Sequence, residues 1–353
     1  MAVDKRMEPV VMADIANRVQ DNEVVVDIEN PDSVSIETED GGMIIDFDPD
    51  PSVDDAPFDA NLSEYLAEDY LTSLAQELIG AYEDDLSSRK DWEDTYIEGL
   101  DLLGLKIEDR TEPWPGACGV HHPLLAESVI RFQSQAISEL FPAQGPARTK
   151  IIGEVTSELY EQSGRVQTYL NYLLTEEMSE FRAETERMLF SLPLAGSSFK
   201  KVYYDPNMGR PCSMFIPAED VVVYNGATDI KTLSRMTHRM RKSANEIRKL
   251  QVSGFYRDVE LNGAEAYIDP VKEKKAEIVG ENLSYSSMGS YLKSETVHTL
   301  LEIQVDLDIE GFEDMQDGEA TGIAVPYVVT VDKGSAQVLS IRRNFLEEDP
   351  LKR

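Results

Sequence analysis

The residues best suited to chemistry in this chain lie in one short loop, WPGACGVHHPLL, at positions 114–125. The loop holds the thiol of Cys118 and the imidazoles of His121 and His122. These are half of the cysteines and half of the histidines in a chain of 353 residues. Such a set could hold a zinc ion, or could pair a nucleophilic cysteine with a base.

Neither chemistry is complete in this loop. A structural zinc site takes four ligands, usually as spaced pairs, whereas the adjacent His121 and His122 diverge. Neither Cys212 nor His238 belongs to a matching pair elsewhere in the chain. No family signature surrounds Cys118, although the sequence leaves His121 open as its base. We therefore expect a turn in which the glycines free the backbone and His122 lies at the cap of the next helix.

A glutamate-rich stretch, TEEMSEFRAETER at 175–187, is the second candidate, because paired carboxylates can transfer protons or bind divalent ions. On a helix, however, Glu176, Glu180 and Glu184 follow one another at a spacing of four, which places like charges side by side. We expect this helix to have basic neighbours from elsewhere in the fold, or to face water.

One basic island interrupts the acidic chain, at 235–250. It could dock an acidic protein or a phosphate group, or its charges could pair locally with the acidic surface. The sequence leaves both interpretations open. The basic residues of the island are Arg235, Arg239, Arg241, Lys242, Arg248 and Lys249.

Charge is the strongest global signal. The chain has 33 basic and 67 acidic residues, a net charge of −34. Such a surface repels phosphate and argues against tight, sequence-reading DNA binding, while weak or transient contact stays open. The acidity could also serve solubility alone. No apolar run of about 18 residues is present, no secretory signal opens the chain, and two cysteines fit a reducing cytosol.

The pattern along the chain predicts an α+β fold with N-terminal helices followed by a mainly antiparallel β region. Residues 1–62 form an acidic arm, disordered or ordered only against a partner. Residues 63–195 repeat apolar side chains at helical spacing, whereas 196–353 alternate with a period of two around one helix at 243–251. The polar stretch 262–295 indicates a surface excursion. Because the sequence stops directly after a strand, we expect the chain to be truncated at its C-terminus.

The third helix of this series has an apolar face that is complete in the sequence. Its members recur at spacings of four, three, four and four, and Pro123 suits the first turn because its missing N–H costs nothing there. We expect this face to pack in the core or between subunits. The apolar residues are Leu125, Val129, Phe132, Ala136 and Leu140.

A set of collinear segments resembles the portal proteins of tailed bacteriophages, in particular the long type found in short-tailed phages. The set spans roughly residues 58–350, and its specificity rests on the order of its pieces. These are FDANLSEYL, SSRKDWEDTYIEGLDLLGLK, EPWPGACGVHHPLLAESVIRFQSQAISELFPAQGP, GSSFKKVYYDP, FIPAEDVVVY, GFYRDVEL and PYVVTVDKGSAQVLSIRRNFLEEDP.

The resemblance implies a non-enzymatic subunit of a closed ring, commonly of twelve copies, at one vertex of the capsid. Double-stranded DNA enters through the ring, driven by the large subunit of terminase, and later leaves by it. Capsid and scaffolding proteins and tail adaptor proteins are the implied partners, and no membrane is involved. The protein would be assembled in the host cytoplasm and located in the virion. Residues 63–195 and 196–353 would build the wing, with parts of the stem or clip in the second region.

The residues themselves agree with this resemblance, because no catalytic, cofactor-binding or metal-ligating residue stands out. Two other functions stay open. One is a metal- or thiol-dependent hydrolase that uses Cys118, His121 and nearby carboxylates. The other is a different head–tail adaptor or scaffold-like protein.

Overall fold

The computed structural model describes most of the chain and divides it into two compact units, Met1–Pro51 and Ser52–Arg353. In the first unit it describes only a backbone pair, in which β1 (Ser35–Glu37) and β2 (Met43–Ile45) run antiparallel. In the second unit the described residues are 56–103, 112, 114–117, 119, 122–205, 208–224, 226–230, 233–261, 269–279, 296–316 and 319–346.

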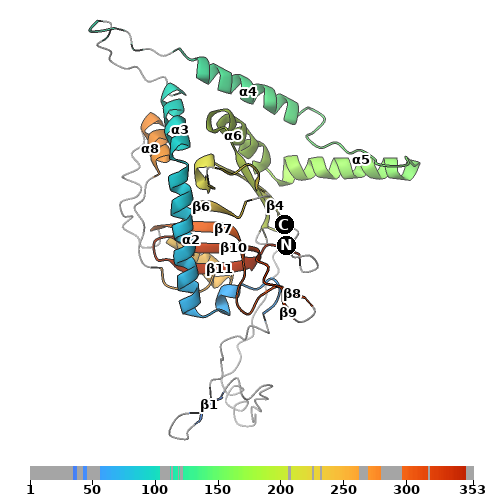
Figure 1. Cartoon of the computed structure of the whole chain (residues 1–353). Helices are drawn as coiled ribbons and strands as arrows, with labels where there is room; N and C mark the ends of the chain where they lie inside the picture. The colour runs from blue at the N-terminus through green and yellow to red at the C-terminus, as the bar shows by residue number, and fades with distance from the viewer. Residues whose placement is uncertain are drawn as a thin grey trace, which may run out of the picture. The chain divides into compact units, whose positions relative to one another are not determined.

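The second unit has the mixed α+β composition that the sequence predicts, with helices first and strands afterwards (Figure 1). Three short helical turns join the longer elements: η3 (Leu62–Glu64), the π turn η4 (Leu173–Glu177) and η5 (Ala218–Asp220). The α-helices are α2 (Glu68–Ser88), α3 (Lys90–Leu103), α4 (Leu124–Leu140), α5 (Ser157–Tyr172), α6 (Glu180–Ala195), α7 (Ala244–Val252) and α8 (Pro270–Val279).

The strands of the second unit are all paired antiparallel. Five of them form the main sheet in the order β11-β10-β7-β6-β5, and two pairs, β3-β4 and β8-β9, stand apart from it. Their bounds are β3 (Phe199–Asp205), β4 (Arg210–Ile216), β5 (Val221–Val222), β6 (Arg235–Ser243), β7 (Val297–Leu307), β8 (Met315–Gln316), β9 (Glu319–Ala320), β10 (Val325–Asp332) and β11 (Gln337–Arg343).

The core lies on both faces of the main sheet, because side chains alternate along its strands. Leu301 of β7 packs on the face that α2 covers, and its neighbour Leu300 packs with Ile247 of α7 on the other. Figure 1 shows α2 running across the strands of this sheet. From α2, Leu71, Leu74 and other apolar residues at helical spacing enter the same core cluster.

Two local expectations are corrected. The interpretation of 262–295 as a surface excursion is wrong for 270–279, which form α8 with Val271 and Ala276 buried. Because α8 buries only two side chains, its sequence shows little helical periodicity.

Pro123 is the N-cap of α4, directly before the first helical residue, and His122 precedes it. In the described part of the chain, no helix is both long and apolar enough to cross a membrane.

Side chains close two edges of the main sheet. The Asn61 amide accepts a hydrogen bond from Ile341 N at 2.9 Å and donates one to Leu339 O at 3.1 Å, both on β11. At the opposite edge, Arg89 donates to Val221 O of β5 at 2.8 Å. Both side chains are buried. Because unpaired backbone groups at a strand edge invite pairing with another chain, these contacts protect the sheet as well as stabilise it.

We predict that Asn61→Ala lowers the free energy of unfolding by about 1–3 kcal/mol, because it leaves a buried N–H and a buried C=O short of a partner. Urea unfolding followed by circular dichroism measures the change. The control is Asn245→Ala on the exposed surface of α7, expected within about 0.5 kcal/mol of the parent. Equal stabilities for the two variants would contradict the role of Asn61.

Candidate interaction surface

The loop at 114–125 forms the expected turn where the structure describes it. Ala117 N donates to Trp114 O at 3.1 Å, and Gly116 has a φ of 85°, a conformation that favours glycine. Cys118 and His121 lie outside the described residues, so their candidate role as nucleophile and base stays a hypothesis. Within the described ranges, no three His, Cys, Asp or Glu side chains are grouped to hold a metal ion.

The glutamate-rich helix α6 has the basic neighbour that its charge pattern indicates. Arg210 of β4 donates to Glu180 Oε1 at 2.8 Å, and this hydrogen bond lowers the pKa of the Glu180 carboxyl. Glu184 accepts a hydrogen bond from the backbone N–H of Phe215 at 2.8 Å. Glu180 and Glu184 of α6 therefore bind β4, whereas Glu186 pairs with Arg182 of its own helix.

Ion pairs within the fold engage some of the cations of the basic island. Arg235 makes a bidentate pair with Asp85 of α2, and Arg248 pairs with Asp258. The remaining cations include Arg241 and Lys249, both exposed. Local pairing is thus confirmed for part of the island, and a docking patch would have to use the rest.

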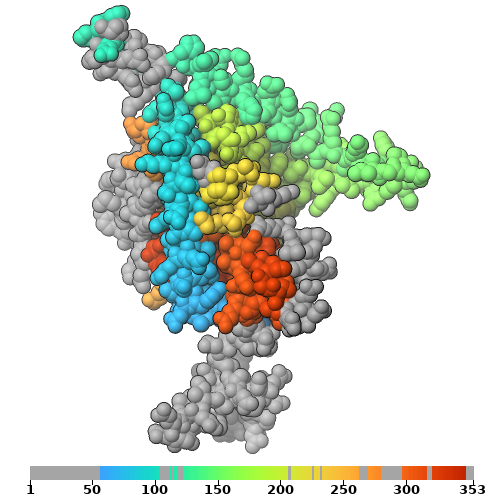
Figure 2. All heavy atoms as spheres, in the orientation of Figure 1, coloured from blue at the N-terminus to red at the C-terminus, as the bar shows by residue number. Residues whose placement is uncertain are grey.

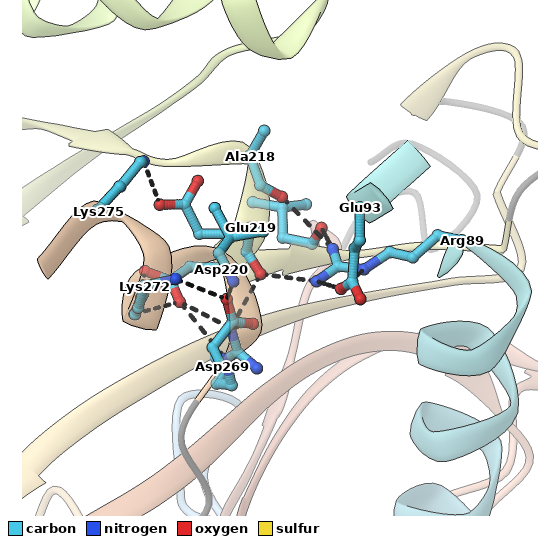
Figure 3. A network of polar contacts seen from close by, with 11 residues as sticks. Arg89, Glu93, Ala218, Glu219, Asp220, Asp269, Lys272 and Lys275 are labelled. Atoms are coloured by element: carbon cyan, nitrogen blue, oxygen red, sulfur yellow. Dashed lines mark hydrogen bonds and ion pairs between the residues drawn. The ribbon is translucent and has the colours of Figure 1, made fainter. Parts of the chain in front are cut away.

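A buried polar network ties the α-helices to the sheet (Figure 3). At its centre Arg239 of β6 donates to Asp269 Oδ2 at 2.5 Å, and Asp269 Oδ1 accepts the N–H of Val271 in the first turn of α8. From α8, Lys272 pairs with Asp220 at 2.6 Å and Lys275 pairs with Glu219 at 2.6 Å. All six of these charged side chains are thus paired with a neighbouring charge of opposite sign.

The same network includes the junction between α2 and α3. Arg89 donates to Glu93 Oε1 at 3.1 Å and to Glu219 O at 2.9 Å (Figure 3). Burial raises the pKa of the Glu93 carboxyl, although Arg89 acts in the opposite direction. A small cavity of about 170 Å³, lined by Arg89 and by apolar residues such as Trp92 and Phe199, lies beside the network. Because the Arg89 guanidinium is engaged with Glu93 and with backbone carbonyls, we interpret the network as structural.

A second buried ion group fixes the β3-β4 hairpin on the main sheet. Lys201 of β3 donates to Glu302 of β7, at 2.6 Å for Oε2, and His238 Nδ1 lies 3.6 Å from Glu302 Oε1. Burial alone would raise the pKa of Glu302, but the interactions with His238 and Lys201 outweigh it and lower the pKa to about 2. The ion pair between Lys201 and Glu302 thereby joins the β3-β4 hairpin to the main sheet.

Exposed apolar side chains lie on α4, α5 and β3, and these residues are here called the arm surface. Helix α5 has no buried residue, and Figures 1 and 2 show it extending away from the strands. Exposed apolar side chains concentrate on these three elements. They are Leu124, Ile130, Phe132 and Leu140 of α4, Leu159, Tyr160, Val166, Tyr169, Leu170 and Tyr172 of α5, and Val202, Tyr203 and Tyr204 of β3.

The apolar residues of α5 are arranged as a stripe rather than scattered. Leu159, Val166 and Leu170 follow at spacings of seven and four, which places them on one helical face. An adjacent face is covered by its own chain, since Asn171 exchanges hydrogen bonds with Ala147 at 2.9 and 3.1 Å. The apolar stripe has no such cover among the described residues.

Helix α4 shows the same imbalance. Of the apolar face that the sequence predicts, only Val129 is fully buried, while Phe132 and Leu140 are exposed. The helix is therefore confirmed, and of its expected apolar face only Val129 packs fully within one chain. Exposed apolar side chains that gather on one face of a helix are typical of a site of interaction with another protein. No protein-family model matches the chain, and no curated protein sequence matches it at a significant level.

We predict that the ionised carboxylate of Glu302 stabilises the fold at neutral pH. Because its pKa is lowered from 4.5 to about 2, this contribution is lost as the pH falls through that interval. Glu302→Gln should therefore be less stable than the parent at pH 7, by up to about 3 kcal/mol, and the difference should shrink toward pH 2. Urea unfolding at a series of pH values measures it, with the exposed Glu310→Gln as control; a difference independent of pH would overturn the assignment.

Proposed function

We propose that the chain is a portal subunit of a tailed bacteriophage. In this role a ring of copies, commonly twelve, sits at the unique vertex of the capsid. The terminase motor drives double-stranded DNA into the capsid through the ring, DNA is ejected by the same route, and tail or adaptor proteins dock on the outside. Residues 63–195 and 196–353 would then form the wing, with possible stem or clip parts in the second. The proposal is supported by the collinear resemblance over residues 58–350 and by the arm surface.

The arm surface is the observation that carries the proposal. A ring needs a heterologous interface, in which one patch of a subunit meets a different patch of the next and the rotation closes. Helices α4 and α5 offer apolar side chains that their own chain leaves in water. Covering them with a neighbouring copy would contribute about 25 cal/mol for each Å² of apolar surface removed from water.

The charge of the chain suits a conduit. A subunit with a net charge of −34 repels the phosphate backbone, so duplex DNA can pass without being held. The three charge pairs that join Arg239 to Asp269 and α8 to η5 are satisfied within the fold, and we interpret them as structural.

Two other functions make different predictions. A hydrolase that uses Cys118 and His121 would turn over a substrate, lose activity in Cys118→Ala, and contain stoichiometric metal if it were metal-dependent. An adaptor or scaffold-like protein would stay monomeric when purified alone, or would form no ring with a central hole.

We expect the purified chain, or a longer chain that contains it, to form rings with a central hole in negative-stain images. Val166→Asp places a charge within the α5 stripe and should shift the assembly toward monomers in light scattering. The control is Val252→Asp, the same change at an exposed valine of α7, which should leave the rings intact. A monomer that turns over a substrate would overturn the proposed function.

We also expect purified rings to hold duplex DNA poorly at an ionic strength of about 0.15 M, because the acidic surface gives no release of counterions. A fluorescence anisotropy titration with a labelled duplex of random sequence measures the affinity. Nanomolar binding that persists at higher salt would contradict the conduit.

A further inference from the structure

Helix α8 depends on its contacts with other elements for its helical form. It has ten residues, and isolated helices shorter than about 12–15 residues are marginal in water. Val271 and Ala276 are its buried side chains, whereas Ile278 and Val279 of its last turn are exposed. Because the apolar contribution of two such side chains is small, the charged contacts of α8 decide whether it stays in place.

The N-terminal end of α8 is firmly held. Asp269 precedes the helix, and its Oδ1 accepts the N–H groups of Val271 at 3.0 Å and Lys272 at 3.2 Å. Its Oδ2 accepts a hydrogen bond from Arg239 of β6 at 2.5 Å. The side chains of this pair are only 3% and 4% exposed, so water has little access to them. Asp269 therefore anchors the start of α8 to the main sheet.

The body of α8 is held by lysines that lie nearer to water (Figure 3). Lys272 pairs with Asp220 and Lys275 pairs with Glu219, both at 2.6 Å. The side chains of these two lysines are 26% and 36% exposed, several times more than those of the anchoring pair. Water can therefore replace the lysine contacts while the anchor at the start of the helix stays closed.

The carboxylate of Glu219 favours an opening of α8. Glu219 is 2% exposed, and only its Oε1 accepts a hydrogen bond from Lys275. Its Oε2 is buried without a hydrogen-bond partner among the described residues. A buried polar atom without a partner is destabilising, and water would satisfy it. Because Lys275 belongs to α8, release of this helix would let water reach both oxygens.

Helix α7 is of similar length but is attached in another way. The N–H of Ala244 in its first turn donates to Thr296 O at 2.7 Å, directly before β7. Ile247 packs with Leu300 of β7 in a buried apolar cluster. These contacts join the helix to the strand through the backbone and through apolar burial. Helix α7 is therefore a reference against which the attachment of α8 can be measured.

We infer that α8 is a strap that opens and closes without unfolding of the main sheet, with Asp269 as its fixed end and Lys272 and Lys275 as the contacts that release. Segments with few buried apolar contacts open locally in this way. In the open form water solvates Glu219 and Asp220, so no carboxylate is left buried without its cation. The strap is a property of the single chain and does not depend on the proposed function.

Opening of the strap would change the surface of the second unit. Figure 1 shows α8 beside α3, and Val271 packs in one cluster with Tyr96 and Leu100 of α3. Lys275 Nζ lies 5.2 Å from the centre of the Tyr96 ring. The open form would therefore present an aromatic ring of α3 and the carboxylates of η5, which the closed form covers.

Hydrogen–deuterium exchange of the full chain at pH 7, followed by mass spectrometry of its peptides, measures the opening. After correction for intrinsic rates, we expect the amides of 272–279 to exchange at least about a hundredfold faster than those of β7, and faster than those of α7. Equal protection of α8 and β7 would mean that α8 opens only with the whole fold, which contradicts the strap. A complete lack of protection in 272–279 would mean that no closed form exists, and it contradicts the strap equally.

Lys275→Met tests whether charge closes the strap, because methionine keeps most of the side-chain length and removes the cation. Exchange in 272–279 should become faster by at least about tenfold, since Glu219 then lies buried without its partner, while β7 stays within about twofold. The matched control is Lys249→Met at an exposed lysine of α7, which should change neither segment by more than about twofold. Exchange in 272–279 that is unchanged or slower in Lys275→Met would show that apolar packing closes the strap and would refute the inference.

Lys274→Met is the second variant, for use if Lys275→Met does not fold. Lys274 pairs with Asp101 of α3 at 2.7 Å, and the Asp101 side chain is 47% exposed. Its loss leaves no charge buried, so the chain should fold and exchange in 272–279 should become faster by about threefold. An unchanged rate in this folded variant would count against the strap.

Discussion

The fold depends on the guanidinium of Arg89. This residue ends α2 and precedes α3, and it is almost fully buried. Its nitrogen atoms bond to Glu93 and to three backbone carbonyls in 218–221, at 2.8 to 3.4 Å. An arginine suits this place because its donors are fixed in a plane and its charge is permanent. It therefore holds the junction of α2 and α3 against the edge of β5. The positions of the core under α2 and of the smaller core around α3 both depend on this one side chain.

The sequence predicts the elements better than the contacts between them. Periodicity alone indicates strands after residue 195, where β3 is the first, and the cap of α7 is visible because Ser243 and Glu246 form a reciprocal pair three residues apart. Contacts such as that of Asn61 with β11 join residues 278 and 280 positions apart, which no local pattern records. Helix α8 was missed for a related reason, because ion pairs with distant residues hold it.

The arm surface was half visible in the sequence. The apolar face of α4 could be identified from its spacing, but spacing cannot tell whether a face is covered, since cover comes from elements far away in the chain. The basic island illustrates the reverse case. It stands out in the sequence, yet Arg235 and Arg239 are engaged with Asp85 and Asp269. In the folded chain, the most conspicuous basic residues are thus paired with acidic side chains. The exposed apolar residues of the arm surface have no such contacts among the described residues.

The π turn η4, between α5 and α6, has a geometric consequence for that surface. The N–H of Met178 reaches back five residues to Leu173 O, so the turn holds one residue more than an α-helical turn would. Each residue rotates a helix by roughly 100° about its axis. A single additional residue therefore sets the direction in which the Leu159–Leu170 stripe faces. Deleting one residue from this turn would rotate α5 about its axis and leave its composition unchanged.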